Sequence, residues 1–164
     1  MYVEVSGTPG EIGSLRSGLA VANTAATTTT VLFELTELDG SATGLSSSLS
    51  LPPSGQVARF VDELFPTLTT SFQGILRITT TPDAVASIGL RLRINERGDI
   101  LTTTTPPANE AAETTSAELI FPHLVDTGGW TTQFILFSGV AGQSSTGSMT
   151  FVSQSGQALG LVVR

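Results

Sequence analysis

The sequence has no cysteine, no lysine and a single histidine among its 164 residues. Without cysteine the chain can form no disulfide, no thiolate metal site and no thiol nucleophile. Seven arginines against fourteen acidic residues give a net charge of −7. This balance argues against nucleic acid, whose phosphates attract clustered cations, and against an anionic membrane surface. We therefore expect a protein that is not an enzyme and that needs no metal and no cofactor.

Charged residues are also scarce, at 13% of the chain, whereas 40% of the residues are hydrophobic. This is enough apolar material for a sizeable core. No segment has the length and apolar character needed to cross a bilayer, and the start lacks the basic head and apolar run of a signal peptide. Threonine, serine and glycine dominate instead, which favours an exported protein, or a piece of one, that is extracellular or at the cell surface.

Alternation of apolar and polar residues predicts β-strands along most of the chain. Residues 88–94 alternate with one polar face, and residues 33–36 lead through the turn Asp39-Gly40 to a second strand at 45–51. Residues 134–137 are apolar on both faces, which is typical of a doubly covered central strand. The same alternation predicts strands at 75–81, 99–103, 149–153 and 158–163. The fold class that follows is all-β, an antiparallel β-sandwich of the immunoglobulin-like or jelly-roll-like kind.

One short helix is predicted at a sandwich end. Apolar residues fall at helical spacing at Val57, Phe60, Val61 and Leu64. Ser54 is placed to cap the start of this helix, and Pro66 lies just beyond its end. Arg59 is expected to pair with Asp62 or Glu63 across one turn. We interpret the helix as a plug that closes the sandwich rather than as a binding element.

Residues 106–117 read as a linker because they are polar and show no apolar periodicity. The expected organisation is a β-sandwich module at 1–105, this linker, and a further segment at 118–164. The further segment is predicted to supply strands to the same sandwich or to a neighbouring one.

The further segment also matches the start of the chain at an offset of 116 residues. The stretch Gly40-Ser41-Ala42-Thr43-Gly44-Leu45 is similar to Gly156-Gln157-Ala158-Leu159-Gly160-Leu161. The same offset aligns Val3 and Val5 with Leu119 and Phe121, Gly13 with Gly129, Leu19 and Val21 with Ile135 and Phe137, and Phe33 and Leu35 with Met149 and Phe151. The apolar phase agrees across three strands and the turns between them, which indicates one full copy of a repeat followed by the opening part of a second.

A few strands alone cannot bury a hydrophobic face in water. The partial copy must therefore complete the first sandwich or pair with strands of another chain. Contacts of the second kind, repeated head to tail, do not close and build a filament. The predicted assembly residues are Leu119, Phe121, Phe134, Ile135, Leu136, Phe137, Met149, Phe151, Leu161 and Val163.

Several separated motifs occur in order and carry a resemblance. They are Ala58-Arg59-Phe60 with Glu63-Leu64-Phe65-Pro66, Phe72-Gln73-Gly74, Asn95-Glu96-Arg97-Gly98-Asp99 with Thr103-Thr104-Thr105-Pro106, Phe121-Pro122, and Gly128-Gly129-Trp130-Thr131-Thr132. In these motifs the chain resembles repeated β-sandwich modules near the ends of large secreted bacterial surface proteins. The first copy departs from the pattern at Gly13-Ser14-Leu15-Arg16. The resemblance implies an extracellular β-rich module and no catalytic residues.

Two clusters offer candidate chemistry, and each has a plainer interpretation. His123 lies near Asp126, but no nucleophile elbow appears in the sequence, so we interpret this residue as a loop histidine. The oxygen-rich stretch 95–99 lacks the spacing of an EF-hand calcium loop. A β-turn with Gly98 at positive φ and Arg97 paired to an acid is the favoured interpretation of that stretch.

Sugars enter in two further predictions. Trp130 and Phe134 could form a sugar-stacking platform, although packing of Trp130 over the sandwich end is the favoured interpretation. The threonine runs beside proline are predicted sites of O-linked sugars, at Thr102, Thr103, Thr104, Thr105, Thr114 and Thr115.

The function that these patterns predict is a structural subunit of an extracellular filament or surface array, which polymerises by strand complementation with copies of itself. The alternative is a glycan-binding or adhesion module of a large bacterial surface protein.

Overall fold

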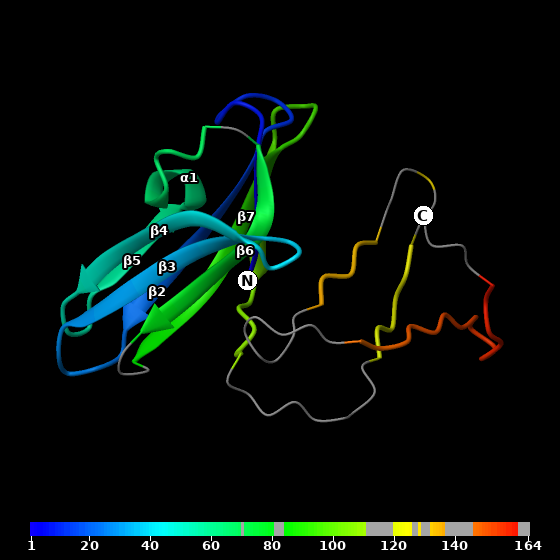
Figure 1. The fold of residues 1–164 in the computed structure, drawn as a ribbon. Coiled ribbons are helices and arrows are strands. Elements are labelled where there is room, and N and C mark those ends of the chain that lie inside the picture. The colour runs from blue at the N-terminus through cyan, green and yellow to red at the C-terminus, as the bar shows by residue number, and fades with distance from the viewer. Residues whose placement is uncertain are drawn as a thin grey trace. The chain divides into compact units, whose positions relative to one another are not determined.

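The computed structural model describes residues 1–69, 71–80, 84–110, 120–125, 128, 132–136 and 146–160. The chain divides into two units, Met1–Asn109 and Glu110–Arg164. All helices and strands in the described part of the chain lie in the first unit (Figure 1). In chain order they are β1 (Tyr2–Ser6), β2 (Leu15–Asn23), β3 (Thr29–Glu37), β4 (Ala42–Leu51), β5 (Gln56–Phe60), α1 (Val61–Leu64), β6 (Phe72–Thr80), β7 (Val85–Ile94) and β8 (Ile100–Thr105).

The eight strands form one antiparallel sheet in the order β4-β3-β6-β1-β2-β7-β8, and β5 also pairs with β2. Strand β1 pairs with the start of β2 at Leu15 and Arg16. Strand β5 pairs with the later residues Gly18 to Ala22. Strand β7 pairs with the other edge of β2 along its whole length. Two strands thus share one edge of β2, and the sheet parts there into a layer β4-β3-β6-β1 and a layer β5-β2-β7-β8. The predicted all-β, sandwich-like fold is confirmed.

Every second side chain of the inner strands points into the core, because side chains of a strand alternate between its two faces. Val3 and Val5 of β1, with Leu19 and Val21 of β2, are buried in it. Strands β3, β4 and β6 and the helix region add Val31, Phe33, Leu35, Leu51, Val61, Leu64, Phe65, Phe72 and Leu76. Burial of these side chains is the main stabilising term of the unit, at roughly 1.5–3 kcal/mol for each large apolar side chain.

The predicted helix over residues 57–64 is wrong in its first half. Residues Gln56–Phe60 form β5, and α1 spans only Val61–Leu64. The five residues of β5 pair with β2, and a ladder of this length outweighs the weak helical preference of a short segment. Ser54 is not the cap, because the helix starts after Phe60, whose backbone N–H donates to the Glu63 carboxylate at 3.0 Å. Arg59 donates to the carbonyl of Ala58, and it is Arg16 that pairs with Asp62 and Glu63.

The second unit is described in part, and its described residues contain one isolated bridge, between Val152 and Ala158. Residues 134–136 carry no strand assignment. The prediction of a central strand covered on both faces is therefore not met at these positions, because Leu136 is 65% exposed. Among the described residues no helix has the length and apolar character to span a membrane.

Candidate functional site

Strand β7 turns its apolar face away from the core. Leu19 and Val21 of β2 point into the core, so the intervening Ala20 points outward. Ala20 lies directly opposite Ile88 of β7, and cross-strand partners share a face. Ile88 is 42% exposed, and the outward face of β7 continues along the strand. Its members are Ala86, Ile88, Leu90, Leu92 and Ile94.

The polar face of β7 is the one that meets β1. Arg91 forms an ion pair with Glu4 of β1, which also accepts hydrogen bonds from Tyr2 and Gln73, both at 3.2 Å. A Cβ atom added to Gly89 would collide with the side chain of Met1. Burial and the neighbouring Glu4 carboxylate raise the pKa of Tyr2 above its ordinary value of 10.0. The contacts with β1 thus involve Gly89 and Arg91 on the polar face of β7, and the apolar face lies on the opposite side of the strand.

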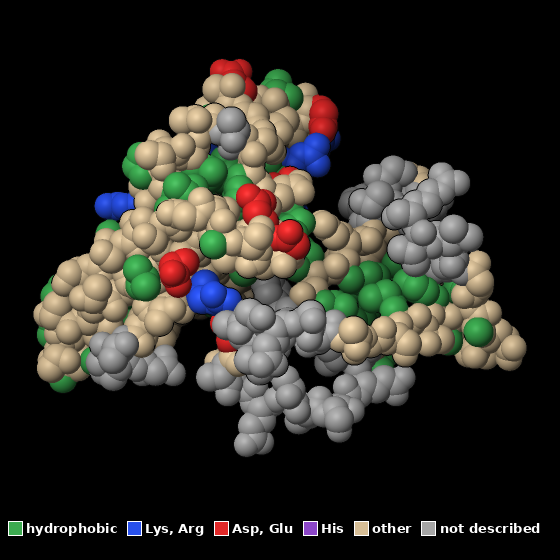
Figure 2. Space-filling model, in the orientation of Figure 1, with side chains coloured by type: hydrophobic (Ala, Val, Ile, Leu, Met, Phe, Trp, Pro, Cys, Tyr) green, Lys and Arg blue, Asp and Glu red, His purple; other side chains and the backbone are tan. Residues whose placement is uncertain are grey.

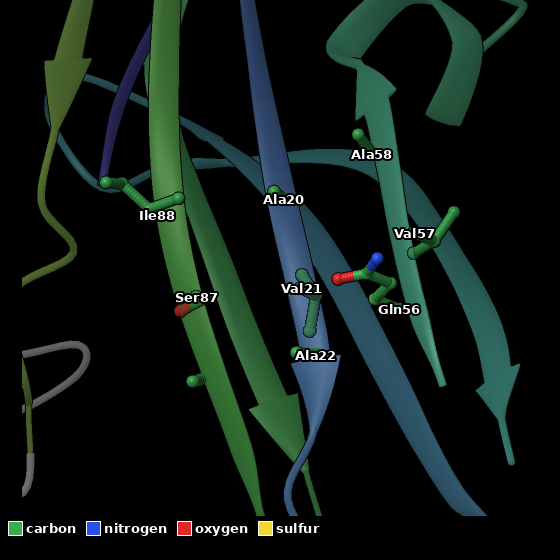
Figure 3. A pocket seen from close by; sticks show the side chains of 9 residues that line it. Ala20, Val21, Ala22, Gln56, Val57, Ala58, Ser87 and Ile88 are labelled. Carbon is green, nitrogen blue, oxygen red and sulfur yellow. The ribbon is translucent and has the colours of Figure 1, made fainter. Parts of the chain in front are cut away.

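A shallow groove of about 550 Å³ crosses the outer side of β5, β2 and β7 (Figure 3). Small apolar side chains dominate its lining, and Gln56 and Ser87 are its polar side chains. None of its lining residues is titratable, so the groove offers no general acid or base. Its lining consists of Ala20, Val21, Ala22, Gln56, Val57, Ala58, Ala86, Ser87 and Ile88.

Strand β8 forms one open edge of the sheet, because β7 is its only strand partner in the described part of the chain. Its sequence Ile-Leu-Thr-Thr-Thr-Thr carries no charge and no proline. Natural sheets usually protect an open edge with lysine, proline or a bulge. Ile100 is 64% exposed, and the residues up to Thr104 are exposed as well. Open edges of this kind, with unpaired backbone groups and no protective charge, are general templates for strand pairing.

The second unit presents apolar side chains to solvent. Phe121 is 51% exposed and Met149 is 46% exposed, and Phe134, Ile135 and Phe151 are half-buried. Phe121 and Phe134 meet edge to face, with ring centroids 4.9 Å apart. Figure 2 shows hydrophobic side chains gathered on the described part of this unit. Four predicted assembly residues, Leu119, Phe137, Leu161 and Val163, lie outside the described residues.

A tight turn in the second unit has the hydrogen bonds of the β3–β4 turn, 116 positions later. In the first turn Glu37 N–H donates to the Ser41 carbonyl at 2.9 Å, and Gly40 N–H donates to the Glu37 carbonyl at 3.0 Å. In the second turn Ser153 N–H donates to Gln157 at 2.8 Å, and Gly156 N–H donates to Ser153 at 2.9 Å. For each of the two hydrogen bonds, the donor and the acceptor in the second turn lie 116 positions after those in the first turn.

The agreement extends beyond these bonds. Gly40 has φ 85° and Gly156 has φ 79°, a left-handed conformation that favours glycine. The bridge between Thr36 and Ala42 recurs between Val152 and Ala158, again at an offset of 116. The two segments therefore adopt the same turn in the same register.

The remaining predicted residues divide between loops, the β8 edge and the undescribed positions. His123 is exposed, whereas Asp126 and Trp130 lie outside the described residues. Thr102, Thr103 and Thr104 are exposed on β8, and Thr105 is half-buried there. Thr114 and Thr115 lie outside the described residues. O-linked sugars on these threonines stay a prediction.

The stretch from Asn95 to Asp99 is a turn, as predicted. Gly98 has φ 82°, and Arg97 pairs with Asp99 at 3.1 Å. The side-chain carbonyl of Asn95 accepts the backbone N–H groups of Arg97 and Asp99 at 2.9 and 2.8 Å. No cluster of three or more potential metal-ligating side chains occurs among the residues that the structure describes.

Sequence reasoning missed the β8 edge and the outward face of β7. The sequence of a strand does not determine which strands will be its neighbours. The alternating apolar residues of β7 have the pattern of a strand face that packs into a core, although they lie on its outward face. The neutral composition of β8 was the available signal, because edge strands usually carry a protective charge.

No protein family, curated protein or solved structure matches the chain.

Proposed function

We propose that the protein is a structural module that assembles with copies of itself, through strands passed between neighbours, into an extracellular filament or surface array. The observation that carries this proposal is the exposed apolar surface of the second unit. In the first unit the aligned residues Val3, Val5, Phe33 and Leu35 are buried in a core. At the matching positions Phe121 and Met149 stand open to solvent.

Physical chemistry supports a partner for these residues. Contiguous exposed apolar side chains usually mark an interaction site, and two isolated strands are marginally stable in water. Strand addition to an open sheet edge meets both needs, since it pairs the backbone and gives alternate side chains a surface to pack on. A copy that both donates strands and offers an edge makes a contact that repeats without closing, which produces a filament.

The first unit offers the matching edges. Strands β4 and β8 end the sheet, and neither Ala42–Leu51 nor Ile100–Thr105 contains a charged residue. Both edges can therefore accept a strand without burying an unpaired charge. The resemblance to repeated modules of secreted bacterial surface proteins agrees with an assembly outside the cell.

The test measures the assembly state of the full chain by sedimentation velocity over a wide concentration range and by negative-stain microscopy. We expect oligomers or filaments that grow with concentration. Leu136→Lys should weaken assembly at least tenfold because it places a charge on the exposed apolar surface. The control Gln133→Lys adds the same charge at an exposed polar position nearby and should assemble like the unmodified chain. Compact monomers at high concentration would contradict the proposal.

A further inference from the structure

Strand β8 resembles β6, the strand that pairs with β3 inside the first unit. Residues 75–80 read Ile-Leu-Arg-Ile-Thr-Thr, and residues 100–105 read Ile-Leu-Thr-Thr-Thr-Thr, so the first two and last two letters agree. Both strands are antiparallel members of the same sheet. They differ in one respect: β6 has β1 and β3 as neighbours, whereas β8 has only β7 among the described strands.

The backbone groups of the two strands also point in corresponding directions. Leu76 exchanges hydrogen bonds with Met1, so the alternation of an antiparallel ladder directs Ile75, Arg77 and Thr79 toward β3. In β7, the carbonyl of Ile94 accepts a hydrogen bond from the Gly13 N–H, and the Ile94 N–H donates to the Ser14 carbonyl. The backbone groups of Ile94 thus point toward the β2 side of β7.

The backbone N–H and C=O groups of Arg93 and Arg91 therefore point toward β8, and those of their partners Leu101 and Thr103 point toward β7. The groups of Ile100, Thr102 and Thr104 are left pointing to the open edge. These are the positions that match Ile75, Arg77 and Thr79.

The segment before the second turn is the counterpart of β3. Its bridge, its turn and its glycine conformation repeat those of the β3–β4 hairpin at an offset of 116. In this alignment Met149 takes the place of Phe33, and Phe151 takes the place of Leu35. Within the described part of the chain, residues 148–151 pair with no second strand apart from the hairpin itself.

We propose that β8 receives residues 148–152 of a second copy of this chain, in the register in which β6 receives β3. This inference rests on the proposed self-assembly and names its contact. In β3–β6 the pairs are Phe33 with Ile78, Leu35 with Leu76 and Thr36 with Ile75. In the same register, the proposed pairs between two copies of the chain are Met149 with Thr103, Phe151 with Leu101 and Val152 with Ile100.

The side chains fit this register. Ile100, Leu101 and Val152 are exposed hydrophobic residues of the described chain, and each gains an apolar neighbour in the proposed pairs. Phe151 meets Leu101 on one face, and Val152 meets Ile100 on the other. Aromatic and β-branched cross-strand pairs of this kind stabilise a sheet. The pairing opposes no like charges, because neither segment carries a charged residue.

The absence of cysteine allows a direct test by disulfide trapping. One full-length chain carries Thr103→Cys and a second carries Met149→Cys, and the two are mixed and oxidised. Residues directly opposite one another in a ladder lie about 4.5–5.5 Å apart at Cα, within disulfide reach. We expect the mixed disulfide to form at least ten times faster than in a control mixture of Thr103→Cys with Val152→Cys. Val152 lies on the opposite face and three positions along in the proposed register.

Peptide mapping of the trapped species and sedimentation of the unmodified chain separate the outcomes. A mixed disulfide between positions 103 and 149 in excess over the control supports the inference. Assembly without that excess overturns this register and leaves the proposed function standing. Preferential Thr103→Cys homodimers would show that β8 pairs with β8, which overturns the inference. A third sample is a chain that carries both Thr103→Cys and Met149→Cys. A disulfide that forms only within this chain would show pairing inside one molecule and would also overturn the inference. Failure to assemble at any concentration, with no mixed disulfide, removes both proposals.

Discussion

Arg16 lies over the ring of Phe60, with its guanidinium carbon 3.7 Å from the ring centroid. Arg16 belongs to β2 and Phe60 ends β5, so this contact joins the two strands directly before α1 begins. The same guanidinium donates to both oxygens of Asp62, at 2.7 and 3.2 Å. Arginine is suited to this double role because its planar fork matches a carboxylate and its face stacks on a ring.

Arg16→Ala should lower the free energy of unfolding by about 1–3 kcal/mol, because it removes a partly buried cation–π contact and a bidentate ion pair. Arg16→Lys should recover only part of this loss, since an ammonium cannot make the paired bonds. Urea denaturation of the full chain measures both variants. Arg59→Ala is the matched control at an exposed position, and an equal loss there would contradict the assigned role of Arg16.

Asn23 is buried and joins the β2–β3 loop to the connection between β4 and β5. The carbonyl oxygens of Thr27, Leu51 and Pro52 lie 2.8 to 3.0 Å from its amide nitrogen and share the two N–H groups of that amide. Its oxygen accepts the Ala25 N–H at 2.9 Å. Asn23→Ala should destabilise the chain by about 1–3 kcal/mol, because the buried carbonyl of Leu51 would lose its hydrogen bond from Asn23 and the part-buried bonds to Thr27 and Ala25 would be lost as well. The control Thr24→Ala changes an exposed neighbour and should leave the thermal midpoint nearly unchanged.

Gly74 has no room for a side chain. A Cβ atom at this position would lie 2.3 Å from the Thr36 carbonyl and 2.4 Å from the Phe72 ring. Gly74→Ala should therefore destabilise the sheet by about 1–3 kcal/mol through overpacking. Gly147→Ala is the matched control, because no atom lies within 4 Å of its added Cβ. Equal unfolding midpoints for the two variants would show that β6 and β3 are not packed as described.

Tyr2 is the chain's single tyrosine, so absorbance at alkaline pH follows its ionisation alone. The pKa of Tyr2 is raised by burial and then by Glu4, so its midpoint should lie above 10.0 in the folded chain. A raised folded-state pKa stabilises the fold below the ordinary pKa, and this contribution is lost as the pH rises through the folded value. Glu4→Gln should lower the pKa of Tyr2, whereas the exposed control Glu11→Gln should not. An unchanged midpoint in Glu4→Gln would remove Glu4 as a cause.

Local patterns in the sequence predicted turns and strands, because these depend mainly on residues close together in the chain. The turn at Asp39-Gly40 joins β3 and β4, and Gly40 adopts the positive φ that such a turn needs. The turn at 95–99 and the strand at 88–94 were also predicted. The helix over 57–64 was predicted at twice its length, because its spacing was helical while its first residues are held by β2.

The sequence by itself determined that the chain builds β-strands and where its main turns fall. These features follow from side-chain alternation and from the conformational freedom of glycine. Only the tertiary structure decided that β7 turns Ile88 outward, that β8 lies at an edge, and that residues 56–60 extend along β2. Each of these depends on which strands become neighbours, and the pairing of distant segments is set by the packing of the whole core rather than by any local run of residues.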